Sequence, residues 1–78
     1  MAFRVSGEKL RAAREKAGLT QATVDRKLEL SASYVSRLES GLTNVTVDTV
    51  YRLASLFDCQ VNDLVVEVDE EGAADDKA

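Results

Sequence analysis

The sequence contains no histidine, no proline and no tryptophan, and its one cysteine is Cys59. Without histidine, a zinc or iron site would rest on Cys59 and carboxylates, which are a poor ligand set. Histidine-based acid–base catalysis is excluded, and no glycine-rich phosphate loop is present. A single cysteine excludes an internal disulfide and is typical of the reducing cytoplasm. We therefore expect no metal, no other cofactor and no enzymatic activity.

Long apolar runs are also absent from the chain. No run approaches the roughly 18 residues of a membrane-spanning helix. The opening MAFRVSGEKL lacks the apolar centre of a signal peptide. We therefore expect a cytoplasmic protein with no membrane contact. The 78 residues, 45% of them apolar, fit one small domain with a modest core.

Acidic residues are concentrated at one end of the chain. Residues 67–78 hold six acids and one lysine, whereas residues 1–66 hold nine basic and eight acidic residues. The net charge of −4 therefore belongs to the end of the chain and not to the rest. We expect a folded domain over residues 1–66 and an acidic tail over 67–78 with the composition of a disordered segment. Such a tail either keeps the protein soluble or competes with nucleic acid for a basic face.

Helix-capping residues divide the expected domain into short segments. A serine or threonine suits an N-cap because its hydroxyl accepts from a free backbone N–H, and glycine suits the residue after a helix. The candidate N-caps are Ser6, Thr20, Ser31 and Thr46, and the candidate terminal glycines are Gly18 and Gly41. We expect five helices, over residues 7–17, 21–28, 32–40, 47–57 and 61–66. The β-branched residues 65–68 (VVEV) also favour a strand.

Apolar residues at helical spacing predict the core of an all-α domain. Helices this short are unstable alone, so they must bury these side chains against one another. The expected core residues are Leu10, Ala13, Ala17, Val24, Leu28, Leu30, Val35, Leu38, Leu42, Val47, Val50, Leu53, Ala54, Phe57, Val61, Leu64 and Val65.

Only Glu29 and Leu30 separate the second expected helix from Ser31, the expected N-cap of the third. So short a connection makes the helices cross steeply, as in a helix-turn-helix unit. Burying Val35 and Leu38 turns small polar side chains and Arg37 outward. Small side chains allow close approach to base edges in a major groove roughly 12 Å wide, and arginine can bind guanine through two hydrogen bonds.

The ends of neighbouring helices offer contacts to the DNA backbone. Gln21 and the free N–H groups at the start of the second helix suit a phosphate, and Thr43 and Asn44 suit a second backbone contact. Serine-rich helix faces also occur in ordinary protein interfaces. Helix geometry alone therefore fits either DNA or another protein as the partner. The candidate DNA-contacting residues are Gln21, Ala32, Ser33, Ser36, Arg37, Ser40, Thr43 and Asn44.

Residues 7–64 resemble the Cro and phage-repressor type (XRE-like) of helix-turn-helix domain. The resemblance is carried by GEKLRAAREKAGLTQ at 7–21, YVSRLESG at 34–41, TNVTVDTVYRLASLF at 43–57 and VNDL at 61–64. It implies a compact, five-helix, repressor-like DNA-binding domain in which the second and third helices form the helix-turn-helix.

The resemblance also implies roles for single residues. Ala32, Ser33 and Arg37 would read the bases, and Ser36 would assist them from nearby. Contact with the DNA backbone falls to Gln21, Thr43 and Asn44. A structural ion pair joins Arg14 and Glu39, and Cys59 is a buried small hydrophobe.

Three positions depart from the family pattern. Asp25 stands where a small residue is usual, and burying an unpaired carboxylate is costly. It must reach solvent or a partner, for which the basic residues nearby in sequence are Arg26, Lys27 and Arg37. On that basis we expect Asp25→Ala to be neutral or stabilising and to tighten DNA binding. Glu29 replaces the usual turn glycine, and Val45 replaces the usual proline before the fourth helix.

These features predict a sequence-specific DNA-binding transcriptional regulator. The expected partner is double-stranded DNA, and the resemblance implies a homodimer on an inverted repeat, as in small repressors or restriction–modification controllers. The dimer surface would be residues 61–68 with Phe3 and Val5, or a strand over 65–68 paired across the two-fold axis. Completion of the core is the plainer role of the same residues.

A protein-binding module is the alternative function. It would be an antitoxin that grips a toxin, and a polymerase contact is another possible protein partner. Asp25 and the acidic tail favour this alternative. Salt separates the two, because DNA binding through several phosphates weakens steeply as salt rises, whereas a mainly apolar protein interface does not.

Overall fold

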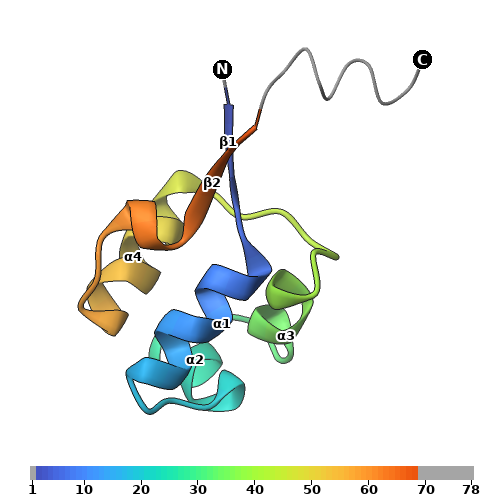
Figure 1. Cartoon of the computed structure of the whole chain (residues 1–78). Coiled ribbons are helices and arrows are strands. Elements are labelled where there is room, and N and C mark those ends of the chain that lie inside the picture. The colour runs from blue at the N-terminus through green and yellow to red at the C-terminus, as the bar shows by residue number, and fades with distance from the viewer. Residues whose placement is uncertain (1, 69–78) are drawn as a thin grey trace.

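The computed structural model describes residues 2–68, which form four α-helices, one 3₁₀ helix and a two-stranded sheet. In chain order the elements are β1 (Ala2–Val5), α1 (Gly7–Lys16), α2 (Gln21–Lys27), α3 (Tyr34–Glu39), α4 (Val47–Phe57), η1 (Val61–Asp63) and β2 (Val65–Val68) (Figure 1). The paired strands lead away from the helices, and α2 lies at the opposite end of the domain from them (Figure 1).

Three of the four expected N-caps are confirmed. The hydroxyls of Ser6, Thr20 and Thr46 accept hydrogen bonds from backbone N–H groups in the first turns of α1, α2 and α4. The expected bounds of α4, 47–57, are confirmed. Gly18 and Gly41 have φ angles of 76° and 77°, a conformation that favours glycine after a helix.

The third helix is shorter than expected, because α3 begins at Tyr34 and not at Ala32. Ser33 has a φ of 65°, which no residue inside a right-handed helix adopts, so Ala32 and Ser33 lie in the turn before the helix. The expected cap Ser31 does not cap α3 with its side chain. Its carbonyl oxygen instead accepts the N–H of Tyr34 at 3.1 Å.

The expected fifth helix, 61–66, is wrong. One 3₁₀ turn is followed by strand β2, which is the alternative that the β-branched residues favoured. β2 pairs antiparallel with β1, and this pairing places Val5 opposite Val65 and Phe3 opposite Glu67. The strand therefore finds its partner within the same chain.

Strand β2 also extends the folded part of the chain beyond residue 66, because it runs to Val68. The remainder of the expected acidic tail, residues 69–78, lies outside the described residues. On the helical side, the Lys9 ammonium donates to the carbonyl oxygens of Asn62 and Val65, at 3.2 and 2.9 Å. This contact fastens α1 to the end of η1 and the start of β2.

Most of the expected core is confirmed. The buried apolar residues are Leu10, Val24, Val35, Leu38, Val50, Leu53, Ala54, Phe57, Leu64 and Val65. Around them, Ala13, Leu28, Leu30 and Val61 are partly buried.

Three expected core residues are wrong, because Ala17, Leu42 and Val47 are exposed. Leu42 follows Gly41, whose left-handed backbone ends the helical register that would have aligned Leu42 with Leu38. Ala17 stands at the C-cap of α1, where the helix ends. Val47 shares a face of α4 with Val50, but it lines an open groove and not the core.

At Gly7, the first residue of α1 packs against the backbone at the end of α3. A Cβ atom at this position would overlap the backbone carbonyl of Glu39, which cannot move away without shifting the helix. Glycine is therefore required here by close packing.

We predict that Gly7→Ala lowers the free energy of unfolding by about 2 kcal/mol, as overpacking of a fixed backbone does. In an ordinary helix the same substitution stabilises by roughly 0.5–1 kcal/mol. Chemical denaturation measures the difference, and Glu8→Ala, an exposed neighbour on α1, is the matched control. A stabilised Gly7→Ala protein would show that the two helices do not touch in this way.

Candidate DNA-binding surface

Helices α2 and α3 are joined by residues 28–33, in which Glu29 and Ser33 both have a left-handed backbone. Glu29, which stands where glycine is usual, has a φ of 57°. A non-glycine residue in this left-handed region costs about 1–2 kcal/mol. The N–H of Leu30 donates to the carbonyl of Asp25 at 2.7 Å and closes the turn. Val24 and Val35 are fully buried where the two helices meet.

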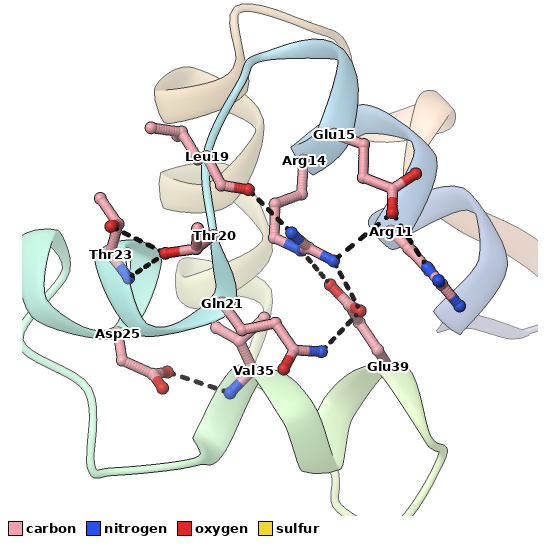
Figure 2. A network of polar contacts seen from close by, with 10 residues as sticks. All are labelled: Arg11, Arg14, Glu15, Leu19, Thr20, Gln21, Thr23, Asp25, Val35 and Glu39. Atoms are coloured by element: carbon pink, nitrogen blue, oxygen red, sulfur yellow. Dashed lines mark hydrogen bonds and ion pairs between the residues drawn. The ribbon is translucent and has the colours of Figure 1, made fainter.

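Asp25 is buried in this junction, with 7% of the residue exposed. Its Oδ1 accepts the backbone N–H of Val35 at 3.0 Å (Figure 2). The partner is therefore a backbone group of α3 and none of the basic side chains considered from the sequence. Because a buried N–H without an acceptor costs about 1–3 kcal/mol, the structure leads us to expect that Asp25→Ala destabilises the domain, in place of the neutral or stabilising effect expected from the sequence.

Arg14 and Glu39 meet across α1 and α3. The Nε of Arg14 donates to Oε2 of Glu39 at 2.7 Å, and the side chains are 10% and 7% exposed. A second guanidinium nitrogen donates to Oε1 at 3.3 Å, and a third donates to the carbonyl of Leu19 at 2.7 Å. The hydrogen bond with Glu39 raises the pKa of Arg14 above its ordinary value, against the lowering effect of burial.

Gln21 joins the same carboxylate from α2. Its Nε2 donates to Oε1 of Glu39 at 2.9 Å (Figure 2). Gln21 is half-buried at the first residue of α2, and it shares a small hollow with Arg11 and Ser40. The side chain expected to contact phosphate is thus held in place by the end of α3.

The candidate base-reading residues lie at the start of α3 and just before it. Ala32 and Ser33 are exposed in the turn, while Ser36 and Arg37 are half-buried on the helix. The Arg37 guanidinium reaches back along the helix and donates to the carbonyl of Ala32 at 3.2 Å and to the hydroxyl of Ser31 at 3.5 Å. The one cation of this group therefore lies over the turn that presents Ala32 and Ser33.

The loop between α3 and α4 carries the other candidate contacts. Ser40 and Asn44 are exposed, and Thr43 is half-buried. The hydroxyl of Tyr34 donates to the carbonyl of Asn44 at 3.0 Å and so ties this loop to the first residue of α3. Sequence reasoning did not assign Tyr34 a role, although it is the only aromatic residue in the segment 31–41.

The family model described as helix-turn-helix matches residues 10–64. This chain belongs to the Cro and repressor type of helix-turn-helix family. The comparison with curated proteins gave no match, and neither did the comparison with solved structures. Family membership identifies the protein in general terms as a DNA-binding transcriptional regulator.

Charge is balanced over the helix-turn-helix domain, since residues 2–68 carry nine basic and nine acidic side chains. Arg26 and Lys27 are exposed in the last turn of α2, and Arg11 is exposed on α1. Arg11 is a further cation beside Gln21 that sequence reasoning missed. The sequence around Arg11 did not indicate a DNA contact, because Arg11 pairs with Glu15 at the i,i+4 spacing that is ordinary on a solvated helix face.

Cys59 is half-buried and packs against the core of the helix-turn-helix domain. Burial raises the pKa of its thiol, and the carboxylates of Asp63 and Asp58 raise that pKa further. The thiol therefore stays protonated near neutral pH and is a weak nucleophile. Within residues 2–68, no group of acidic or cysteine side chains is arranged to hold a metal ion. None of the helices described is both long and apolar enough to span a membrane.

We predict that Glu39→Ala destabilises the domain by about 3 kcal/mol, because it leaves the buried Arg14 charge without its partner. Denaturant unfolding followed by circular dichroism measures the loss. The matched control is Arg11→Ala, which breaks an exposed ion pair whose side chains are 67% and 56% exposed. The free energy of unfolding of Arg11→Ala should stay within about 1 kcal/mol of the wild-type value. Equal losses of stability in the two variants would contradict the structural role of Glu39.

Proposed function

We propose that this protein is a sequence-specific transcriptional regulator that binds an inverted-repeat operator as a homodimer in the cytoplasm. Small repressors and restriction–modification controllers are regulators of this kind. The observation that carries the proposal is the start of α3, where exposed small side chains stand beside one guanidinium. The mechanism is occupancy, in which the dimer covers a promoter or assists polymerase at one.

The shape of α3 supports entry into the major groove. As the recognition helix, α3 would turn Val35 and Leu38 toward the core, and the exposed residues next to its two ends, Ala32, Ser33 and Ser40, are small. Ala32 suits contact with a thymine methyl group, and serine hydroxyls both donate and accept. Arg37 can exchange its contact with the Ala32 carbonyl for the O6 and N7 acceptors of a guanine.

Contacts to the DNA backbone would flank the bases on both sides. Gln21 stands at the start of α2, and Thr43 and Asn44 stand in the loop that follows α3. Tyr34 holds that loop next to the recognition helix. Contacts of this kind set the register of a protein on the duplex without reading its sequence.

An apolar groove supports self-association. Phe3, Val47 and Tyr51 are 62%, 72% and 61% exposed, and all three line one groove between β1 and α4. A single small module buries only roughly 600–1,000 Å² on DNA. Two copies that cover this groove would read two half-sites about one helical turn apart. In that dimer a strand pair across the two-fold axis would extend a sheet in which β1 and β2 already pair.

The same groove favours the second candidate function, a protein-binding module such as an antitoxin. A protein partner, either a toxin or polymerase, would then cover Phe3, Val47 and Tyr51 in place of a second copy. The apolar character of the groove makes no distinction between these partners. The salt dependence of binding distinguishes DNA binding from protein binding, because only the DNA complex releases counterions when it forms.

We predict that selection from a random DNA pool yields one enriched sequence arranged as an inverted repeat. Its affinity should fall steeply between low and physiological salt, because phosphate contacts are replaced by counterions. Fluorescence anisotropy over a salt series measures the slope. A pool without enrichment would favour the protein-binding module, and a single enriched half-site would mean that the homodimer is wrong.

We predict that Arg37→Ala weakens binding to the selected operator by roughly 1–3 kcal/mol and relaxes preference at one base position. Gln21→Ala is the contrasting variant, since loss of a backbone contact should weaken operator and random DNA alike. Titration of both variants against both DNAs measures the difference. If Arg37→Ala weakens all sequences equally, Arg37 contacts phosphate and reads no base.

A further inference from the structure

The recognition helix has no N-cap of its own. Ser33 stands at the N-cap position with a left-handed backbone, and its side chain makes no capping hydrogen bond. The first N–H groups of any helix lack intrahelical acceptors. Val35, the second residue of α3, is fully buried, so water does not supply an acceptor for its N–H. Another part of the protein must provide it.

Asp25 provides that acceptor from the neighbouring helix. Oδ1 of its carboxylate accepts the N–H of Val35 at 3.0 Å, and its carbonyl oxygen accepts the N–H of Leu30 at 2.7 Å. One residue of α2 thus binds both the middle of the turn and the first turn of α3. Figure 2 shows the second of these contacts, between Asp25 and Val35. A negative charge next to the start of a helix is also favoured by the helix dipole.

We propose that Asp25 is a positioning residue for DNA recognition, which caps α3 from α2 and so sets the orientation of the base-reading turn. The inference rests on the proposed function, because it concerns how the same surface binds its operator. Asp25 itself touches no DNA, since it is buried between the helices. Its carboxylate links the helix that begins with Gln21 to the turn that presents Ala32 and Ser33.

The hydrogen bond between Asp25 and Val35 matters more for binding to the operator than for binding to DNA of any sequence. Phosphate contacts tolerate small displacements, whereas hydrogen bonds to base edges require a fixed distance and angle. Without the carboxylate, the N–H of Val35 is left without an acceptor and the start of α3 can move to find one. The affinity for operator should then fall while the affinity for random DNA is kept.

The test compares Asp25→Ala with Asp25→Asn, which keeps the Oδ1 acceptor. Ser6→Ala is the matched control, because Ser6 caps α1 by accepting the N–H of Lys9 at 3.2 Å and α1 carries none of the base-reading residues. Affinity is measured for the selected operator and for random duplex of equal length, at a temperature where circular dichroism shows every variant folded. Hydrogen exchange of the Val35 amide is measured by NMR in the free protein.

We expect Asp25→Ala to lose about tenfold or more in operator affinity, to keep its affinity for random DNA, and to exchange the Val35 amide faster. Asp25→Asn should restore most of the operator preference and the slow exchange, and Ser6→Ala should keep both. If Asp25→Ala does not fold, Asp25→Glu replaces it, because that change keeps the charge and moves the oxygens by one methylene. We expect it to lose operator preference as well.

Wild-type preference in Asp25→Ala or Asp25→Glu, or equal losses on both DNAs, would overturn this inference while the regulator function stands. If the wild-type protein itself prefers no sequence, the proposed function fails and the role of Asp25 on DNA fails with it. Exchange of the Val35 amide then still reports whether the cap exists in the free protein.

Discussion

The carboxylate of Glu39 is the point at which three helices of this domain are held together. It accepts two hydrogen bonds from Arg14 of α1 and one from Gln21 of α2, while it belongs to the last residue of α3. A buried carboxylate is tolerated only when its lone pairs are satisfied in this way. Directly beside it, Gly7 packs against the Glu39 carbonyl. Together these contacts restrict where the end of α3 can lie relative to α1 and α2.

Helix α3 is short, and both of its ends are held by other elements. Asp25 of α2 binds its first turn and the Arg14 and Gln21 side chains bind its last residue. A six-residue helix has little stability of its own, so these contacts and the burial of Val35 and Leu38 maintain it. The exposed residues next to its ends, Ala32, Ser33 and Ser40, are small. Because other elements hold α3 in place, these residues need not stabilise it.

Local signals predicted the parts of the fold that depend on neighbouring residues. Ser6, Thr20 and Thr46 cap helices a few residues away, and the period of Val50, Leu53 and Phe57 predicted the buried face of α4. The same reasoning failed at Ser31, because the residue that caps α3 comes from another helix. It also failed for the candidate site at Arg11 and Tyr34, whose relevance depends on what lies beside them in space.

The sequence by itself determined the helix-turn-helix family, the first residues of three of the four α-helices and most of the apolar core, because capping and periodicity act within a few residues along the chain. Only the tertiary structure decided that Asp25 caps α3, that residues 65–68 form a strand with residues 2–5, and that Val47 lines a groove. Each of these depends on groups far apart in sequence. Their contact exists only once burial of the core has brought the helices and the two ends of the described chain together.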